Sequence, residues 1–375
     1  LAWYQQDVEG LLLNAPTAAS GGAASSVWGN VGDLTNQGWE FQIKSRNIVQ
    51  GDFNWTTSFN LTLNSNEVNS LTNFISENNS SLNQGNTITR IGSMLGVYHM
   101  AKSAGINPDT GYEMIYKVDN DKFLKNDNGE FVDKQGNVVK EENRVKNPNY
   151  LDVMTNDQGE KITLPATQTN VANNQAMLDG KTGNPTYFGG LTNTVSYKGV
   201  NLSFTFNFQG GNYIYDSALA RLTNASGARN FSEEYTGNYW TENNTNAKYP
   251  KPSWRNQYRV EGQDANNDGK PETGVFTFSN ETSKYLYEGD YLRLRRIRLG
   301  YDLPQSLLNT LGANQVNVYV VGSNLWTWAP DYPGLSPAVT SFSGNERARN
   351  LAPGNVGSQF TPPTRRFTVG INLGF

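Results

Sequence analysis

Hydrophobic and small polar side chains alternate one by one along several stretches of this chain. Between residues 53 and 65 the even positions carry only Asn, Thr and Ser. The odd positions from 53 to 63 carry Phe53, Trp55, Thr57, Phe59, Leu61 and Leu63. Because successive side chains of a β-strand point to opposite faces, this pattern predicts a strand with one apolar face and one polar face.

The same alternation recurs over residues 200–214, 315–328 and 365–375. Such runs are longer than the usual strand of a globular protein, and they suit a tilted membrane strand of roughly 9–11 residues with some overhang. The last run ends on Phe375, an aromatic carboxy-terminal residue. A final strand of this kind is typical of an outer-membrane β-barrel.

A fifth stretch, residues 285–301, is less regular. Its apolar positions change phase between Leu294 and Ile297, and a β-bulge at Arg295-Arg296 would restore the facing. The stretch carries four arginines, namely Arg293, Arg295, Arg296 and Arg298. Charged residues lining a water-filled lumen explain them better than a basic stripe for nucleic acid, because the net charge of the chain is −4.

The connections between these runs differ greatly in length. Residues 47–52 and 198–199 predict tight turns, and residues 303–312 predict a compact cap with one helical turn. The polar connections 14–33, 66–186, 216–283 and 330–364 are very long. If the strands are antiparallel, every long connection lies on one side of the sheet, as in barrels with long extracellular loops and short periplasmic turns. We expect eight strands, or ten if residues 94–102 and 112–118 also join.

Composition is compatible with a barrel. The chain has 375 residues, of which 36% are hydrophobic and 17% are charged, and its mean hydropathy is −0.61. No apolar run reaches the length of about 18 residues that a spanning helix needs, whereas a barrel strand needs an apolar residue only at every second position. The absence of cysteine and the presence of one histidine, His99, argue against a zinc cluster or a nucleophilic triad. We therefore expect no enzyme and no cofactor other than calcium.

The fold class that follows is all-β, namely an antiparallel transmembrane β-barrel. An open sheet in lipid would leave the backbone groups of its edge strands unpaired, so about eight to ten strands must close alone or belong to a larger barrel. The chain opens at Leu1 without an export signal, which favours a carboxy-terminal piece of a longer protein. The alternatives are a passive porin, or a secreted all-β adhesin or carbohydrate-binding module that does not transport.

One loop motif suggests a metal ligand set. Asp264, Asn266 and Asp268, followed by Gly269, match the first half of a calcium loop. Position twelve is Val275, so the usual bidentate glutamate is absent, and Glu272 comes too early to replace it in the usual geometry. A polar turn without calcium is the alternative.

Aromatic residues gather in two places. Trp240, Tyr249, Trp254 and Tyr332 occupy the long connections and are candidates for stacking on sugar rings or peptide side chains; loop core or a partner interface is the alternative. Trp326, Trp328, Phe367 and Phe375 belong to the apolar rows of the last two strands. Aromatic girdles mark the boundaries of membrane barrels, so we expect these residues at a lipid–water interface.

Several stretches together resemble one known family. They are Asn36–Glu40, Trp55–Val68, Ala104–Gly111, Gly189–Leu202, Asp290–Pro304, Val318–Leu325 and the terminal strand. Spread over nearly the whole chain, they resemble the carboxy-terminal part of the SusC/RagA family of TonB-dependent outer-membrane transporters.

The resemblance implies a barrel of about 22 strands, of which residues 1–375 would form roughly the last ten. It implies a plug and a TonB-contacting segment before Leu1, in the outer membrane of a Gram-negative bacterium. It also implies a SusD-type surface lipoprotein as partner, and active import of oligosaccharides or peptides.

Overall fold

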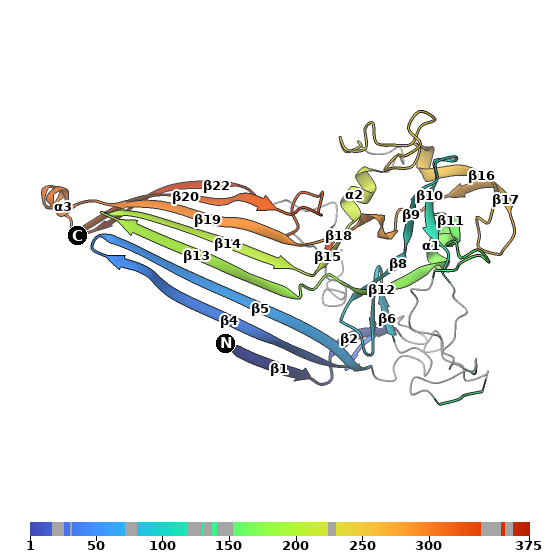
Figure 1. Ribbon diagram of the computed structural model, residues 1–375, viewed down its shortest axis with the longest axis horizontal. Helices are drawn as coiled ribbons and strands as arrows, with labels where there is room; N and C mark the ends of the chain where they lie inside the picture. Colours follow the sequence, from blue (N-terminus) through green and yellow to red (C-terminus); the bar gives the residue numbers. More distant parts are fainter. Residues whose placement is uncertain are drawn as a thin grey trace.

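The computed structural model describes residues 1–16, 26–30, 32–71, 81–118, 130, 137–140, 153–223, 230–338, 354–356 and 363–375. Its main feature is one long sheet of eight strands, with smaller sheets and short helices gathered beyond one end of it (Figure 1). We call these smaller elements the head. Every pair of neighbouring strands in the long sheet is antiparallel, as the alternation predicts.

The strands of the long sheet follow one another in space in the order in which they occur along the chain. They are β1 (Ala2–Val8), β4 (Gly32–Gln50), β5 (Phe53–Leu71), β13 (Tyr187–Tyr197), β14 (Val200–Gly210), β19 (Tyr291–Asp302), β20 (Gln315–Trp328) and β22 (Arg366–Gly374). The all-β, antiparallel prediction is confirmed, with eight strands in the sheet. β4 and β5 have 19 residues each, so both extend well beyond the length that crossing a bilayer requires.

The two additional strand candidates do not join this sheet. Residues 94–102 contain β8 (Val97–Ala101), and residues 112–118 contain β10 (Glu113–Tyr116), but both pair with other strands of the head. Their alternation is weak because they are buried on both faces. Of the two alternatives, eight strands or ten, the structure shows eight in the long sheet.

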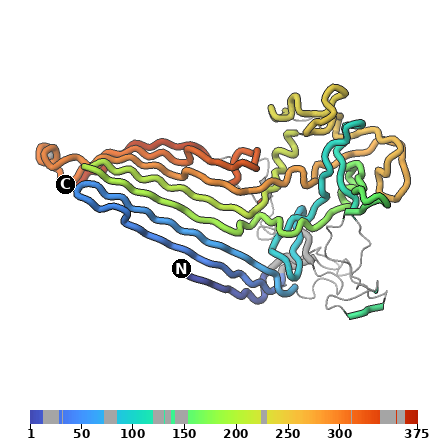
Figure 2. The backbone as a smooth tube through the Cα atoms, viewed as in Figure 1, coloured from blue at the N-terminus to red at the C-terminus, as the bar shows by residue number. Residues whose placement is uncertain are grey.

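All short connections lie at the end of the sheet opposite the head (Figure 2). The turn between β13 and β14 consists of Lys198 and Gly199, whose φ angles are 46° and 85°, as a two-residue hairpin with the twist of its strands requires. The predicted cap is a helix, α3 (Gln305–Leu311), which ends at Gly312 with a φ of 66°. Long connections on one side and short ones on the other are thus confirmed.

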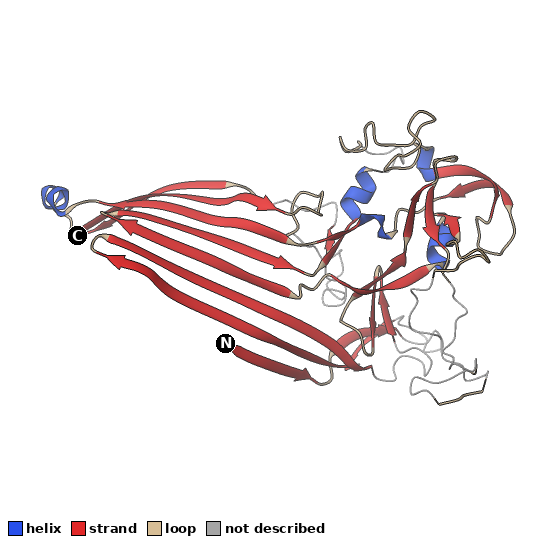
Figure 3. Ribbon diagram, viewed as in Figure 1, coloured by secondary structure: helices blue, strands red, loops and turns tan. Residues whose placement is uncertain are grey.

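The described parts of the long connections contain further strands and short helices (Figure 3). One sheet holds β12 (Gln175–Thr182), β8, β7 (Thr87–Arg90) and β6 (Ser81–Gln84), and another holds β11 (Thr163–Pro165), β10 and β9 (Ser103–Ile106). A third holds β18 (Leu286–Glu288), β15 (Tyr213–Asp216) and β21 (Asn355–Val356); two hairpins pair β16 (Gln257–Gln263) with β17 (Glu272–Thr277) and β2 (Leu12–Pro16) with β3 (Ser26–Asn30). The helical elements are α1 (Gln168–Asn173), α2 (Ser217–Leu222), η3 (Trp254–Asn256) and η4 (Ser283–Tyr285).

Most of the buried hydrophobic clusters lie in the head, and a smaller one, Leu308, Ala313 and Val316, lies beside α3. One buried cluster joins β10, β11 and the β16–β17 hairpin around Ile115, Tyr258 and Phe278. A second cluster consists largely of tyrosines, including Tyr98, Tyr249 and Tyr285, which are almost completely buried. Aromatic side chains bury much surface while their hydroxyls keep a polar contact, so a polar sequence with few aliphatic residues still builds a packed core here.

The apolar row of the long sheet is exposed instead. On β22 the exposed fractions are 71% for Phe367, 72% for Val369 and 60% for Ile371. Val318 and Val320 of β20 pair with Ile371 and Val369 on the same face and are also exposed. A secreted module would bury such a row against a second sheet. The continuous exposed apolar face fits contact with lipid.

Among the described residues, no helix is long and apolar enough to cross a membrane.

Candidate functional site

The opposite face of the long sheet is polar and internally hydrogen-bonded. Thr192 of β13 shares a hydrogen bond of 3.0 Å with Thr205 of β14, and the hydroxyl of Thr194 donates to Ser203 at 3.2 Å. These pairs stand directly opposite each other in the register of the two strands. Cross-strand hydroxyl pairs stabilise a sheet while keeping this face hydrophilic.

Charged residues continue this polar face near the short turns. The guanidinium of Arg298 donates to the side-chain oxygen of Asn317 at 2.6 Å, and the amide of Asn317 donates to Asp302 at 2.7 Å. Asn201 donates to the second carboxylate oxygen of Asp302 at 2.6 Å. Arg298 also lies 4.6 Å from the ring centroid of Tyr319. The network spans three strands and holds a cation on the polar face.

The predicted bulge is confirmed at Arg295. Arg296 pairs with Thr205 and Leu294 pairs with Phe206, which leaves Arg295 without a counterpart on β14. The extra residue keeps Leu294 and Ile297 on the apolar face and places Arg293, Arg296 and Arg298 together on the polar face. Three of the four arginines therefore lie on the polar face, as expected for residues that line a water-filled lumen.

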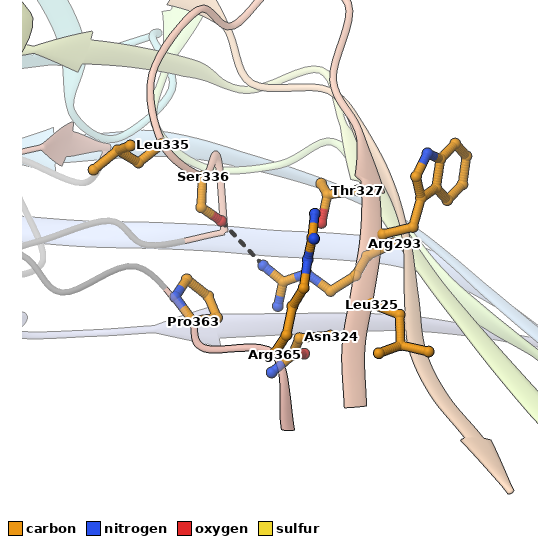
Figure 4. Close-up of a pocket in the computed structure, with 9 residues that line it drawn as sticks. Arg293, Asn324, Leu325, Thr327, Leu335, Ser336, Pro363 and Arg365 are labelled. Atoms are coloured by element: carbon orange, nitrogen blue, oxygen red, sulfur yellow. Dashed lines mark hydrogen bonds between the residues drawn. The ribbon is translucent and has the colours of Figure 1, made fainter. Parts of the chain in front are cut away.

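A cavity of about 260 Å³ opens at the head end of this region (Figure 4). Its lining residues are Arg293, Asn324, Leu325, Trp326, Thr327, Leu335, Ser336, Pro363 and Arg365. On β20, Ser323 pairs with Arg296, and Trp326 pairs with Leu294. The two residues between them, Asn324 and Leu325, therefore form a bulge. Asn324 has a φ of 55°. Sequence reasoning missed this cavity because its walls come from distant parts of the chain.

Two of the four candidate stacking residues are core residues. Tyr249 is fully buried within the tyrosine cluster, and burial raises the pKa of its hydroxyl. Tyr332 is 6% exposed, and its hydroxyl donates to Asp216 at 2.7 Å. Both aromatic rings are already covered by the head, and their contact with a solute stays a prediction.

The two tryptophans differ from these tyrosines. Trp254 is 67% exposed at the start of η3. Trp240 is partly buried: its indole N–H donates to the carbonyl of Pro108 at 2.8 Å, and its ring lies against Gly111. Gly111 has a φ of 71°, and a Cβ there would lie 2.5 Å from the indole ring. Trp240 joins two segments of the head, while Trp254 stays a candidate for solute contact.

The four girdle candidates all lie on exposed apolar positions. Trp326 is 47% exposed, Trp328 is 55% exposed and Phe375 is 84% exposed. Trp328 stands at the head end of β20, whereas the carboxy terminus lies at the short-turn end (Figure 1). Phe367 belongs to the same exposed row. The girdle role stays a prediction, with aromatic residues available at both ends of the sheet.

The calcium-loop residues come together more closely than the sequence indicated. Oxygens of Asp264, Asp268 and Glu272 all lie within 4.8 Å of one another. Asp264 accepts the backbone N–H groups of Asp268 and Gly269, each at 3.1 Å, and Asn266 accepts the N–H of Asp268 at 3.0 Å. Glu272 therefore joins the cluster although it comes early in the loop.

A cation already lies beside this cluster, because the ammonium of Lys117 is 3.6 Å from Asp264. Calcium binding stays a prediction. Titration of calcium into the intact protein should release heat that Asp268→Asn reduces, because carboxylate charge sets the affinity of such loops. A titration without heat would leave the loop as a turn held by its own backbone bonds.

Comparisons with known proteins show which proteins this chain is similar to. No family model matches the chain. The chain is 29% identical over its whole length to the TonB-dependent receptor P3 of Formosa agariphila, covering 32% of that protein. It is 26% identical to the TonB-dependent receptor SusC of Bacteroides thetaiotaomicron, over 83% of this chain and 25% of SusC. The resemblance to the SusC/RagA family is confirmed. Where the chain matches a curated relative from end to end, it spans about a third of that relative's length.

Solved structures show the same fold. The RagAB peptide importer in its closed-closed state superimposes with a TM-score of 0.70 and 22% identity, covering 100% of this chain and 33% of that one. The open-open state gives a TM-score of 0.65. The eight-stranded sheet thus has the fold of part of a β-barrel. The relatives of this chain are receptors and transporters rather than enzymes.

Proposed function

We propose that residues 1–375 form the carboxy-terminal part of the barrel wall of a TonB-dependent importer in the outer membrane of a Gram-negative bacterium. The single observation that carries the proposal is the two-faced sheet: an exposed apolar row on one side and hydrogen-bonded Thr, Asn and Arg side chains on the other. Lipid would cover the first face, and water and solute would pass the second.

The solute would be an oligosaccharide or a peptide. The similarity to SusC and the fold shared with the RagAB peptide importer support this class of cargo. A polar face rich in hydroxyl and amide groups suits solutes that form many hydrogen bonds. The chain would supply part of the barrel wall and the head. None of its described side-chain clusters suggests covalent chemistry.

The partners follow from the same family. A SusD-type surface lipoprotein would close over the head, since the head carries the long connections of the barrel. TonB would act through a plug encoded outside residues 1–375. The short turns and α3 would then face the periplasm, and the head would face the cell exterior.

Uptake by the full-length transporter tests the proposal. In the host bacterium, deletion of the gene should abolish energy-dependent uptake of labelled oligosaccharides or peptides, and the intact gene should restore it. The protein should fractionate with the outer membrane and resist SDS until heated. Recovery of the protein from the culture medium, with uptake unchanged by deletion, would favour the secreted adhesin or carbohydrate-binding module instead.

A further inference from the structure

The cavity at the head end of β19 and β20 is lined by two arginines. Arg293 comes from β19, and Arg365 immediately precedes β22. Figure 4 shows both side chains reaching into the same hollow, with Ser336 facing Arg293 across it. The remaining described lining residues are uncharged, so the described lining carries two positive charges and no negative one.

The hydrogen-bonding capacity of these groups is only partly used. The Nη2 group of Arg293 donates to the hydroxyl of Ser336 at 3.2 Å, but its Nε–H is buried without a protein partner. A buried donor that lacks an acceptor destabilises the structure, and buried polar groups are otherwise almost always paired. The Nε–H of Arg293 is therefore available to a ligand that supplies oxygen acceptors.

Nearby carboxylates do not neutralise the arginines. Within the part of the chain that the structure describes, neither Arg293 nor Arg365 forms an ion pair. Asp290, close in sequence, already accepts the hydroxyl of Tyr187 and the N–H of Gly211. Asp216 accepts the hydroxyl of Tyr332 and the N–H of Leu219. Both carboxylates are thus held by other groups of the head.

We infer that this cavity binds a carboxylate group of the transported solute, on its path between the head and the polar face of the wall. Planar guanidinium groups match a carboxylate with two parallel hydrogen bonds, and Asn324, Thr327 and Ser336 offer neutral hydrogen-bonding groups around them. The inference rests on the proposed import function and deepens it: the cargo would be acidic, either a uronic-acid oligosaccharide or a peptide with acidic side chains.

Binding to the purified full-length transporter in detergent tests this inference. The probes are trigalacturonate and its methyl ester, and triglutamate and triglutamine. One acidic probe should bind at least about tenfold more tightly than its neutral counterpart, since a hydrogen bond to a charged group is worth about a factor of ten or more. The pair that shows this difference identifies the source of the carboxylate. Raising the salt concentration should weaken the preference.

Single substitutions locate the effect. Arg293→Gln and Arg365→Gln should each remove most of the preference for the acidic probe. Arg295→Gln is the matched control, because Arg295 is the exposed bulge residue of the same strand and does not line the cavity. An equal loss in the control, or acidic and neutral probes that bind alike, would overturn the inference. Normal energy-dependent uptake of a neutral solute would show in that case that the import function still stands.

Discussion

The ammonium of Lys284 lies 3.6 Å from the carboxylate of Glu113, and both side chains are almost fully buried. Glu113 belongs to β10 and Lys284 to η4, so the ion pair joins two connections of the barrel that are far apart in sequence. The hydroxyl of Thr282 donates to the second oxygen of Glu113 at 2.7 Å. The pair lies beside the tyrosine cluster, with Lys284 5.0 Å from the ring centroid of Tyr249.

Breaking this ion pair should destabilise the head. Lys284→Met leaves Glu113 buried without its cation, which costs about 3–5 kcal/mol of unfolding free energy. Replacing both residues, with Glu113→Leu added, should restore part of the loss. Arg259 and Glu261 form an exposed pair of the same type, and Arg259→Met is the control that should change stability little. Denaturant unfolding of the intact protein measures all three variants; equal effects for both single methionine variants would contradict the prediction.

Alkaline pH should destabilise the head as well. Burial raises the pKa of Tyr258 to about 12 and that of Tyr285 well above its ordinary value of 10.0. A group whose folded pKa is raised stabilises the fold below its unfolded pKa, and this contribution is lost as the pH rises through the folded value. For Tyr258 the loss falls between about pH 10 and pH 12. Thermal unfolding across this range, followed together with tyrosinate absorbance, checks the prediction, and a melting temperature that rises with pH would contradict it.

A charge on the apolar row should be far more harmful than the same charge on the polar face. Val369→Arg places a cation on the exposed row of β22, at a cost of about 2–4 kcal/mol near the middle of a bilayer. Thr368→Arg alters the neighbouring residue on the opposite face, where water can solvate the guanidinium. Unfolding of both variants in lipid vesicles measures the difference. Equal stability of the two variants would argue that this face does not meet lipid.

Substitution of the exposed and of the buried candidate aromatic residues should have different effects on uptake and stability. Trp254→Ala should change stability by no more than about 0.5 kcal/mol, so any loss of uptake would report on solute contact. Tyr249→Ala removes a fully buried ring and should cost about 3–5 kcal/mol. Uptake and thermal unfolding measured on the same full-length preparations test both expectations. Unchanged uptake in Trp254→Ala would contradict a role of Trp254 in solute contact.

Parts of the wall follow directly from local sequence. The alternation in residues 53–65 and 365–375 specifies which face each side chain takes, since the side-chain period of a strand is two and needs no knowledge of distant residues. The phase change around Arg295 likewise predicts the bulge. Gly199 predicts the tight turn after β13 because glycine accepts a positive φ angle without steric cost.

The head and the cavity depend on contacts that no local pattern records. Tyr249 and Trp254 are both aromatic residues in one polar connection, yet the first is buried and the second is 67% exposed. The difference arises because β8, α2 and η4 cover Tyr249, and their approach is set by packing of the whole head. Residues 94–102 similarly contain a strand, β8, that is buried on both faces, so their sequence alone left open which sheet the strand joins.

The sequence by itself therefore determined the two-faced wall, the positions of its turns and the side on which the long connections lie, because these depend on the geometry of one strand and its neighbour. Only the tertiary structure decided which aromatic residues are buried, brought Glu272 into the acidic loop and placed Arg293 and Arg365 in one cavity. Those outcomes depend on the packing of segments far apart in the chain, where the free energy comes from burial and mutual fit rather than from any repeating pattern.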